Sequence, residues 1–366
     1  MTRWLWRLAW LLVPGAYAVH HFAPDQAVLA FVLACLSLVP LAREMGDATE
    51  DLAERLGPAA GSLLNSTFGN AAELILGIAA LRAGRIDLVK GSITGSILGN
   101  LLLVAGASIT VGGLKFDRLH FSRVGAGASI STLFLAVVAL ATPAMLGKFG
   151  THPQHVIALS ESISVVLLFM YALSLIFSLR TQAQIEKAPA REPLAATPAE
   201  AAAAQAQKES ETPHGPMWRP IVWLLASASA TAVSSEVLVA ALEGTLQRVH
   251  LPEIFVGVVI VAIIGNAAEH STALLFGRRG EMDVALGIAW ESSKQIALFV
   301  APVLVFVGAG LGQPMDLAFS SFEVVAVALA VIATALIASD GETHWLEGAF
   351  LLAVYVVLAI GFYFAP

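Results

Sequence analysis

The stretch Gly-Asn-Ala-Ala-Glu occurs twice in this chain, at residues 69–73 and again at residues 265–269. Each copy ends a strongly apolar run, so each places an asparagine and a carboxylic acid in a segment that is expected to lie in lipid. A carboxylate at the centre of a membrane helix costs about 2.5 to 3.5 kcal/mol on insertion scales. Because this cost occurs twice, at matching places, we expect Glu73 and Glu269 to serve one function together.

The composition is typical of a polytopic membrane protein. Of the 366 residues, 57% are hydrophobic and 13% are charged, and the mean hydropathy is +0.79, whereas soluble domains carry about 25% charged residues. The net charge of -7 without a basic run gives no reason to expect nucleic acid as a partner. The single cysteine, Cys35, excludes an internal disulfide and is expected to pack as a small apolar side chain.

Apolar segments of about 20 residues predict membrane-spanning helices. Eleven segments fit, at residues 5–20, 25–44, 60–82, 88–111, 120–145, 153–180, 217–242, 253–277, 281–310, 316–338 and 342–365. The predicted fold class is therefore all-α. Residues 181–216 contain an Ala/Glu/Gln/Pro-rich string that predicts a solvated cytoplasmic linker.

The two copies of the motif lie 196 residues apart, with five helices from one motif-bearing helix to the next. An odd number of helices inverts the second unit, so the halves are related by a pseudo-two-fold axis in the membrane plane. This predicts an N-terminal helix in residues 1–24, a five-helix repeat in 25–180, the linker in 181–216 and a second five-helix repeat in 217–366. Inverted repeats are the usual frame of secondary transporters, which bind their substrate where the repeats meet.

Lys and Arg in short loops predict the orientation. Most of them lie on the side of the N-terminus, and the other side holds only Arg82, Arg85, Lys90, Lys148 and Arg248. We therefore expect an integral protein of the cell membrane, with the N-terminus in the cytoplasm and the C-terminus outside. Arg3 and Arg7 before an apolar stretch also resemble a signal peptide, but we expect the first helix to be retained.

Helical spacing gathers further polar and small residues near the first acid. The predicted helix 88–111 carries Ser92, Ser96 and Asn100 at four-residue steps, beside a stripe of Gly91, Gly95 and Gly99. We expect the glycine stripe to serve close helix packing. In the second half, Ser292 and Gln295 stand at the offsets of Ser96 and Gly99.

These residues closely resemble the paired repeats of cation/proton exchangers in the calcium/cation antiporter superfamily. The resemblance rests on GNAAE at 69–73 followed by GSILGNLLLV at 95–104, and on GNAAEH at 265–270 followed by QIALFVAP at 295–302. It covers nearly the whole chain. It implies a protein that exports calcium against protons, with calcium ligands at Glu73, Glu269, Asn70, Asn266, Ser96, Ser292 and Gln295.

The residue chemistry agrees with this implication. Calcium takes about 6 to 8 oxygen ligands, which these side chains and backbone carbonyls near Gly69 and Gly265 could supply. Without the cation, two facing acids in a low dielectric must take up protons, so Glu73 and Glu269 are also the expected proton carriers. His270 either orients Glu269 or is a packed core histidine. The expected substrates are Ca²⁺ and H⁺, and no cofactor is expected.

Two alternatives remain open at this point. A relative of the same superfamily could exchange another cation, such as Na⁺, K⁺ or Mn²⁺. An intramembrane enzyme or receptor could also use the two acids, but the sequence has no hydrolase motif such as His-Glu-x-x-His, so we expect no enzyme. The sequence leaves a homo-oligomer open.

Two charged residues depart from the family pattern. Where relatives carry a small residue and an uncharged residue before the glutamine, this chain has Glu291 and Lys294. Their spacing of three residues predicts an ion pair at the inner mouth of the pathway; the alternative is that Lys294 extends elsewhere and Glu291 is a protonated spectator. The secondary candidates are thus Asn100, Glu50, Glu291 and Lys294.

Overall fold

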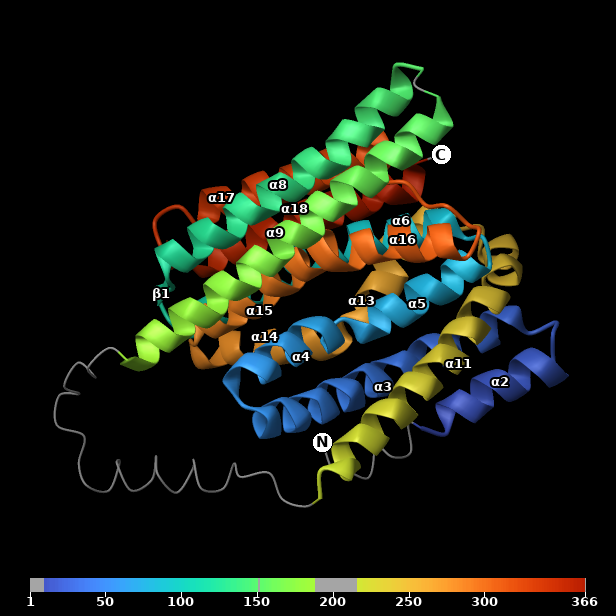
Figure 1. Ribbon diagram of the computed structural model, residues 1–366, viewed down its shortest axis with the longest axis horizontal. Helices are drawn as coiled ribbons and strands as arrows, with labels where there is room; N and C mark the ends of the chain where they lie inside the picture. The colour runs from blue at the N-terminus through green and yellow to red at the C-terminus, as the bar shows by residue number, and fades with distance from the viewer. Residues whose placement is uncertain (1–9, 151, 188–215, 366) are drawn as a thin grey trace.

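The structure of the protein is a computed structural model that describes residues 10–150, 152–187 and 216–365. Most of its helices lie side by side along one direction, as helices that cross a bilayer do (Figure 1). The predicted first helix, 5–20, and the predicted linker, 181–216, lie partly outside the described residues. The all-α fold is confirmed, with one short two-stranded addition.

The first half contains the elements of the first predicted repeat, preceded by a short helix. In chain order they are α2 (Leu12–Phe22), α3 (Ala27–Leu56), α4 (Pro58–Phe68), α5 (Ala71–Arg82), α6 (Ile86–Leu98), the π-helical segment η1 (Gly99–Val104), α7 (Ala105–Gly113), β1 (Leu119–His120), α8 (Arg123–Lys148) and α9 (Pro153–Lys187). Segments α6, η1 and α7 form one continuous span, Ile86–Gly113.

The second half follows the same plan. Its elements are α11 (Trp218–Val249), α12 (Glu253–Phe255), the π-helical segment η2 (Val256–Val261), α13 (Ala262–Gly265), α14 (Ala267–Arg279), α15 (Met282–Gln295), the π-helical segment η3 (Ile296–Val300), α16 (Ala301–Gly310), α17 (Ser321–Ile337), β2 (Glu342–Thr343) and α18 (Trp345–Phe364). Segments α15, η3 and α16 again form one span, Met282–Gly310.

The two halves are inverted with respect to each other. We call the face at which α9 ends and α11 begins the linker face, and the other end of the helices the opposite face. Helix α5 runs from the middle of the molecule to the opposite face (Figure 1). Its counterpart α14 runs from the middle to the linker face. A pseudo-two-fold axis in the membrane plane places repeat-related residues at equal distances from the midplane, on opposite sides of it.

Two predicted spans are broken where the sequence analysis expected continuous helices. Residues 60–82 divide into α4 and α5 at Asn70 (φ -102°, ψ 26°), and residues 253–277 divide before α14 at Asn266 (φ -93°, ψ 10°). The second break bends the chain by 63°. Neither asparagine side chain caps its own helix, and each instead donates a hydrogen bond from Nδ2 to the other repeat, as described below.

Seven helices of the described residues are long and apolar enough to cross a membrane, or eight if the bent pair is one span. Helix α17, with 17 residues, is shorter than the ~20 residues that usually span a bilayer, and α2 begins close to residues that the structure does not describe. The predicted number of eleven spans and the division at residues 24, 180 and 216 therefore stay predictions.

Helix α3 is longer than predicted. The apolar segment ends near residue 44, but the helix continues to Leu56. In the added turns Arg43 approaches Asp47 at 3.9 Å and Arg55 approaches Asp51 at 2.8 Å, both at the i, i+4 spacing that supports an exposed helix. The span thus extends into water on the linker face, where apolarity no longer marks its end.

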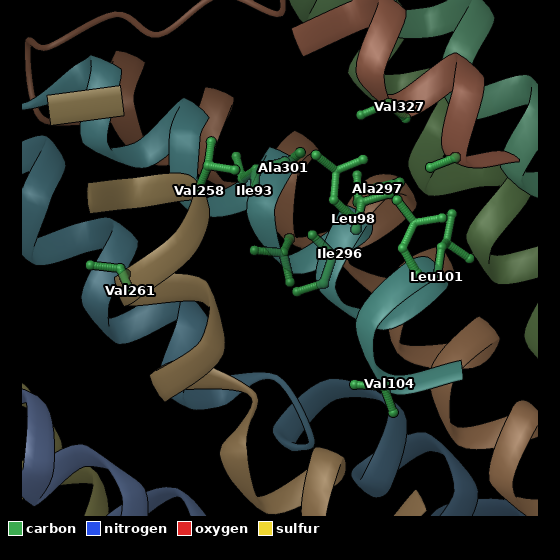
Figure 2. Close-up of a cluster of buried hydrophobic side chains, with 14 of the residues drawn as sticks. Ile93, Leu98, Leu101, Val104, Val258, Val261, Ile296, Ala297, Ala301 and Val327 are labelled. Carbon is green, nitrogen blue, oxygen red and sulfur yellow. The ribbon is translucent and has the colours of Figure 1, made fainter. Parts of the chain in front are cut away.

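Apolar side chains from both halves pack together around the middle of the molecule. Figure 2 shows Leu98 and Leu101 from the first half with Val261, Ile296 and Ala297 from the second, all buried. Cys35 is also buried, in α3, as predicted. This packing fixes α6, η1, η2 and η3 against each other and so sets the distances between polar groups that these segments carry.

The glycine stripe of α6 and η1 packs as predicted at two of its three positions. A methyl group built on Gly91 would lie 3.2 Å from the carbonyl oxygen of Ile254, and one on Gly95 would lie 2.1 Å from that of Val258. No atom lies within 4 Å of such a group on Gly99. Glycine is therefore required at 95 because the backbone of η2 occupies the space of a side chain.

A small antiparallel pair, which the sequence did not predict, joins the halves at the linker face. Strand β1 pairs with β2 through Leu119 and Thr343 and through His120 and Glu342. The pair connects the loop after α7 to the loop before α18. It ties scaffold loops of the two repeats together away from the motif acids.

Candidate cation-binding site

Both motif acids occupy the first turn of a helix that starts in the middle of the molecule. Glu73 follows the break before α5, and Glu269 follows the break before α14. The N-terminus of a helix carries a partial positive charge that favours a nearby carboxylate. The ends of α4 and α13 meet the same breaks and leave carbonyl oxygens without helical partners.

The asparagine of the second motif is held by the first repeat. Asn266 is buried, and its Nδ2 donates hydrogen bonds to Ser96 Oγ at 2.9 Å and to the Ala262 carbonyl at 2.9 Å. Asn100 Nδ2 donates to Ser292 Oγ at 2.8 Å and approaches Asn266 Oδ1 at 3.4 Å. Three of these four contacts cross from one repeat to the other.

The asparagine of the first motif makes the reciprocal contact. Asn70 is buried, and its Nδ2 donates a hydrogen bond to Oε1 of Gln295 in the second repeat. The repeat offset relates Gln295 to Gly99, not to Asn100. Nevertheless Asn100 contacts Asn266 much as Gln295 contacts Asn70, although Asn100 donates through Nδ2 and Gln295 accepts through Oε1. In both repeats this amide stands next to or within a π-helical segment, η1 or η3, and such segments often mark functional positions.

Glu73 reaches across the repeat boundary to the second motif. Glu73 lines a cavity with Ser92, Ser96 and Gly265, and a methyl group on Gly265 would lie 3.7 Å from Glu73 Oε1. The Ser292 side chain lies near the Glu269 carboxylate. The two carboxylates stand near enough to interact electrostatically.

Four side-chain oxygens of the site are buried and have no hydrogen-bond partner among the described groups. They are Asn70 Oδ1, Glu73 Oε2, Asn100 Oδ1 and Glu269 Oε2. An unpaired buried oxygen costs about 1 to 3 kcal/mol, so their presence in one place indicates a site for a cation. Among the described residues there is no cluster of three or more His, Cys, Asp or Glu that could hold a metal ion, so neutral oxygens must complete any coordination.

The predicted site residues thus separate into a connected set and two outliers. The connected set comprises Asn70, Glu73, Ser96, Asn266, Glu269, Ser292 and Gln295, and the secondary candidate Asn100 belongs at its centre. His270 is half-buried and its Nε2 has no hydrogen-bond partner among the described groups. Glu50 lies exposed near the linker-face end of α3.

One buried acid near the site was missed by the sequence analysis. Glu323 is 2% exposed, accepts a hydrogen bond from Thr94 Oγ1 at 2.9 Å and forms a capping box with Ser320 at the start of α17. The Ser-x-x-Glu spacing was the available signal. Because Thr94 stands on α6 between Gly91 and Ser96, Glu323 holds the helix that carries one side of the site.

The predicted ion pair between the two unusual charges is present. Lys294 Nζ lies 2.5 Å from Glu291 Oε2, with the lysine side chain 11% exposed and the glutamate side chain 44% exposed. Lys294 is therefore buried beside Gln295, whereas Glu291 keeps contact with the surroundings on the linker-face side of the site. The pair neutralises a charge that would otherwise stand next to a cation site.

An all-helical membrane protein with two inverted repeats, paired acids and cross-repeat amides where the repeats meet belongs to the class of secondary transporters. Comparison with known proteins agrees. Residues 26–180 and 219–364 match the family model described as sodium/calcium exchanger protein. The chain belongs to this family.

Three relatives illustrate the likeness. The chain is 43% identical over 357 residues to the Ca(2+)/H(+) antiporter of Synechocystis sp., covering 96% of this chain and 95% of that protein. It is 40% identical to the Ca(2+)/H(+) antiporter of Aphanothece halophytica, covering 97% and 95%. The solved structure of native YfkE superposes with a TM-score of 0.79 at 37% identity, covering 96% of this chain and 97% of that one.

The ion pair on α15 predicts a specific result in a double-mutant cycle. Glu291→Gly should impair cation transport severely, because an uncompensated buried charge costs about 3 to 5 kcal/mol. Adding Lys294→Thr should restore most of the activity. Uptake into proteoliposomes measures transport, and thermal unfolding of each purified variant separates loss of transport from loss of folding.

The exposed pair of Arg43 and Asp47 on α3 provides the matched control, since breaking it should leave uptake unchanged. If the losses at 291 and 294 simply add in the double variant, the two residues are not coupled.

Proposed function

We propose that this protein exchanges Ca²⁺ for H⁺ across a membrane by alternating access. The observation that carries the proposal is the pair of acids, Glu73 and Glu269, which stand near each other between the repeats with unpartnered oxygens of Asn70 and Asn100 beside them. Relatives that carry the name Ca²⁺/H⁺ antiporter support the choice of ions.

Calcium would be bound by hard oxygen ligands from both repeats. Glu73 and Glu269 supply the charge, and Asn70, Asn266, Ser96, Ser292 and Gln295 supply neutral oxygens, with Asn100 as a further amide. Calcium accepts about 6 to 8 oxygens in flexible geometry. Gln295 Oε1 and Asn266 Oδ1 already accept hydrogen bonds from Asn70 and Asn100, so cation binding rearranges the amide contacts.

Protons compete with calcium for the same two acids. Without the cation, the acids stand in a region of low dielectric and repel each other, so they take up protons. The calcium-bound and the protonated site are both near neutral, whereas the empty and doubly charged site is costly to enclose. Only the two near-neutral forms then pass between the open states, which couples calcium movement in one direction to proton movement in the other.

Exchange of a cation other than calcium is the alternative function. The family name includes sodium, and exchange of Na⁺, K⁺ or Mn²⁺ would use the same acids. Sodium-coupled relatives usually carry a Thr-Ser or Gly-Thr pattern before the acid, whereas Gly-Asn-Ala-Ala precedes both acids in this chain, which favours protons. An enzyme built on the acids has no cluster of three or more His, Cys, Asp or Glu to support metal-dependent chemistry among the described residues.

The proposal includes a direction across the membrane. The bias of Lys and Arg supports a cytoplasmic linker face, with the N-terminus inside, the C-terminus outside and the cell membrane as the location. The linker 181–216 then joins the two repeats in the cytoplasm. Calcium export in this orientation is driven by protons that enter the cell.

Replacing either motif acid by its amide should reduce exchange to background. Glu73→Gln and Glu269→Gln each remove one charge and one proton carrier while keeping the shape of the side chain. Calcium uptake into vesicles under an imposed pH gradient measures the effect. Glu281→Gln, which changes an exposed acid in the turn before α15, is the matched control and should transport normally. Substantial flux in either purified motif variant would contradict the assignment.

Calcium binding should weaken as the pH falls. Protons added to Glu73 and Glu269 occupy the atoms that bind calcium, so the apparent affinity for calcium should drop steadily from about pH 8 to about pH 6. Transport should also proceed with sodium omitted. Flux that ignores pH in this range, or that requires sodium, would favour the alternative function.

A further inference from the structure

The two repeats meet tightly on one side of the site. On this opposite-face side, Gly91 and Gly95 of α6 pack against Gly257 and Val258 of η2, a contact that we call the opposite-face seam. A methyl group on Gly257 would lie 3.1 Å from Gly91 Cα, and one on Gly95 would lie 2.1 Å from the Val258 carbonyl oxygen. The seam is therefore a backbone-to-backbone contact that leaves no space for a side chain.

On the other side of the site, the residues related to this seam by the repeat are not in contact with each other. The offset of 196 residues relates Gly91 to Gly287, Gly257 to Gly61 and Gly95 to Glu291; we call this set the linker-face seam. A methyl group on Gly287 would have nothing within 4 Å, and Gly61 of α4 packs against Ala53 of α3 instead. The same pair of glycines is thus in contact in one half of the molecule and separated in the other.

Inverted repeats supply a reason for this difference. In such proteins the two open states are related by exchanging the conformations of the repeats. We propose that the two glycine seams are the gates of the transport pathway and close alternately. The structure has the opposite-face seam closed and the linker-face seam open. In the other state, α4 packs on α15 through Gly61 and Gly287, and η2 separates from α6.

The surroundings of the site agree with this arrangement. Gly69, next to the break before α5, is exposed, and Glu291 keeps 44% of its side chain exposed. Both positions lie between the motif acids and the linker face. The acids stand between the two seams, so closing one seam and opening the other changes the face from which Glu73 and Glu269 are reached.

The two gates differ at one position. Glu291 stands where the opposite-face seam has Gly95, and it is bonded to Lys294. Closing the linker-face seam must enclose this ion pair against α4, which costs desolvation that Gly95 does not incur. The pair therefore biases the protein toward the state with the linker-face seam open, which is the state of the structure.

The experiment compares two alanine substitutions with opposite expected effects. Gly287→Ala leaves the present state undisturbed and obstructs closure of the linker-face seam, whereas Gly95→Ala obstructs the closed opposite-face seam. Gly127→Ala in α8 is the matched control, because a methyl group there also has nothing within 4 Å. The readout is reaction of a single cysteine with a membrane-impermeant maleimide in proteoliposomes of known orientation, in a Cys35→Ala background.

The repeat relation also supplies matched probe positions, since Ser92 and Ile288 each follow one of the related glycines. Gly287→Ala should slow labelling of Ser92→Cys from the opposite face about fivefold, which equals ~1 kcal/mol in the equilibrium between the two states. Gly95→Ala should speed this labelling and slow labelling of Ile288→Cys from the linker face. Gly127→Ala should change neither rate.

The proposal is overturned if Gly287→Ala labels like Gly127→Ala at both probes, or if Gly95→Ala and Gly287→Ala shift the rates in the same direction. If Gly95→Ala does not fold, the Gly287→Ala comparison alone decides, since its methyl group meets open space in the present state. The labelling does not depend on which cation is transported, so a wrong choice of ions and a wrong choice of gates give distinguishable results.

Discussion

The hydrogen bonds that cross between the repeats are the constraint on which the rest of the structure depends. A polar side chain in the middle of a membrane protein must find a partner, because no water or lipid headgroup replaces a missing hydrogen bond there. Asn70 and Asn266 find theirs in the other repeat. The helices break at both residues without a side-chain cap, and the breaks deliver two acids and several carbonyl ends to one place.

Repetition made much of the site predictable from the sequence. The chain carries the same polar motif twice within apolar segments, and an odd number of helices from one copy to the next inverts the second repeat. These two facts specify which residues must meet, and the contacts of Asn70, Asn266 and Gln295 follow that expectation. The ion pair of Glu291 and Lys294 was predictable because helical spacing alone brings the two side chains together. In each case, local geometry or internal symmetry carried the information.

The features that were missed depend on contacts that no local pattern encodes. The central place of Asn100 was underestimated because the repeat register points to Gly99, and the π-helical segments alter how side chains project from these helices. The break at Asn70 depends on a partner 225 residues away. The end of α3 was misplaced because charge pairs continued the helix after apolarity ended. Hydropathy predicts which part of a helix lies in lipid, but it does not predict where the helix ends.

The buried lysine adds an electrostatic condition to the exchange cycle. At an effective dielectric constant of about 20, one ammonium group repels a divalent cation about 10 Å away by ~3 kcal/mol, which is enough to weaken binding more than a hundredfold. Lys294 is two residues from Ser292. Cation binding near Ser292 is therefore favourable only while the ion pair with Glu291 neutralises the ammonium charge of Lys294. The more exposed partner of the pair is thus the one that keeps the lysine from repelling a cation at the motif acids.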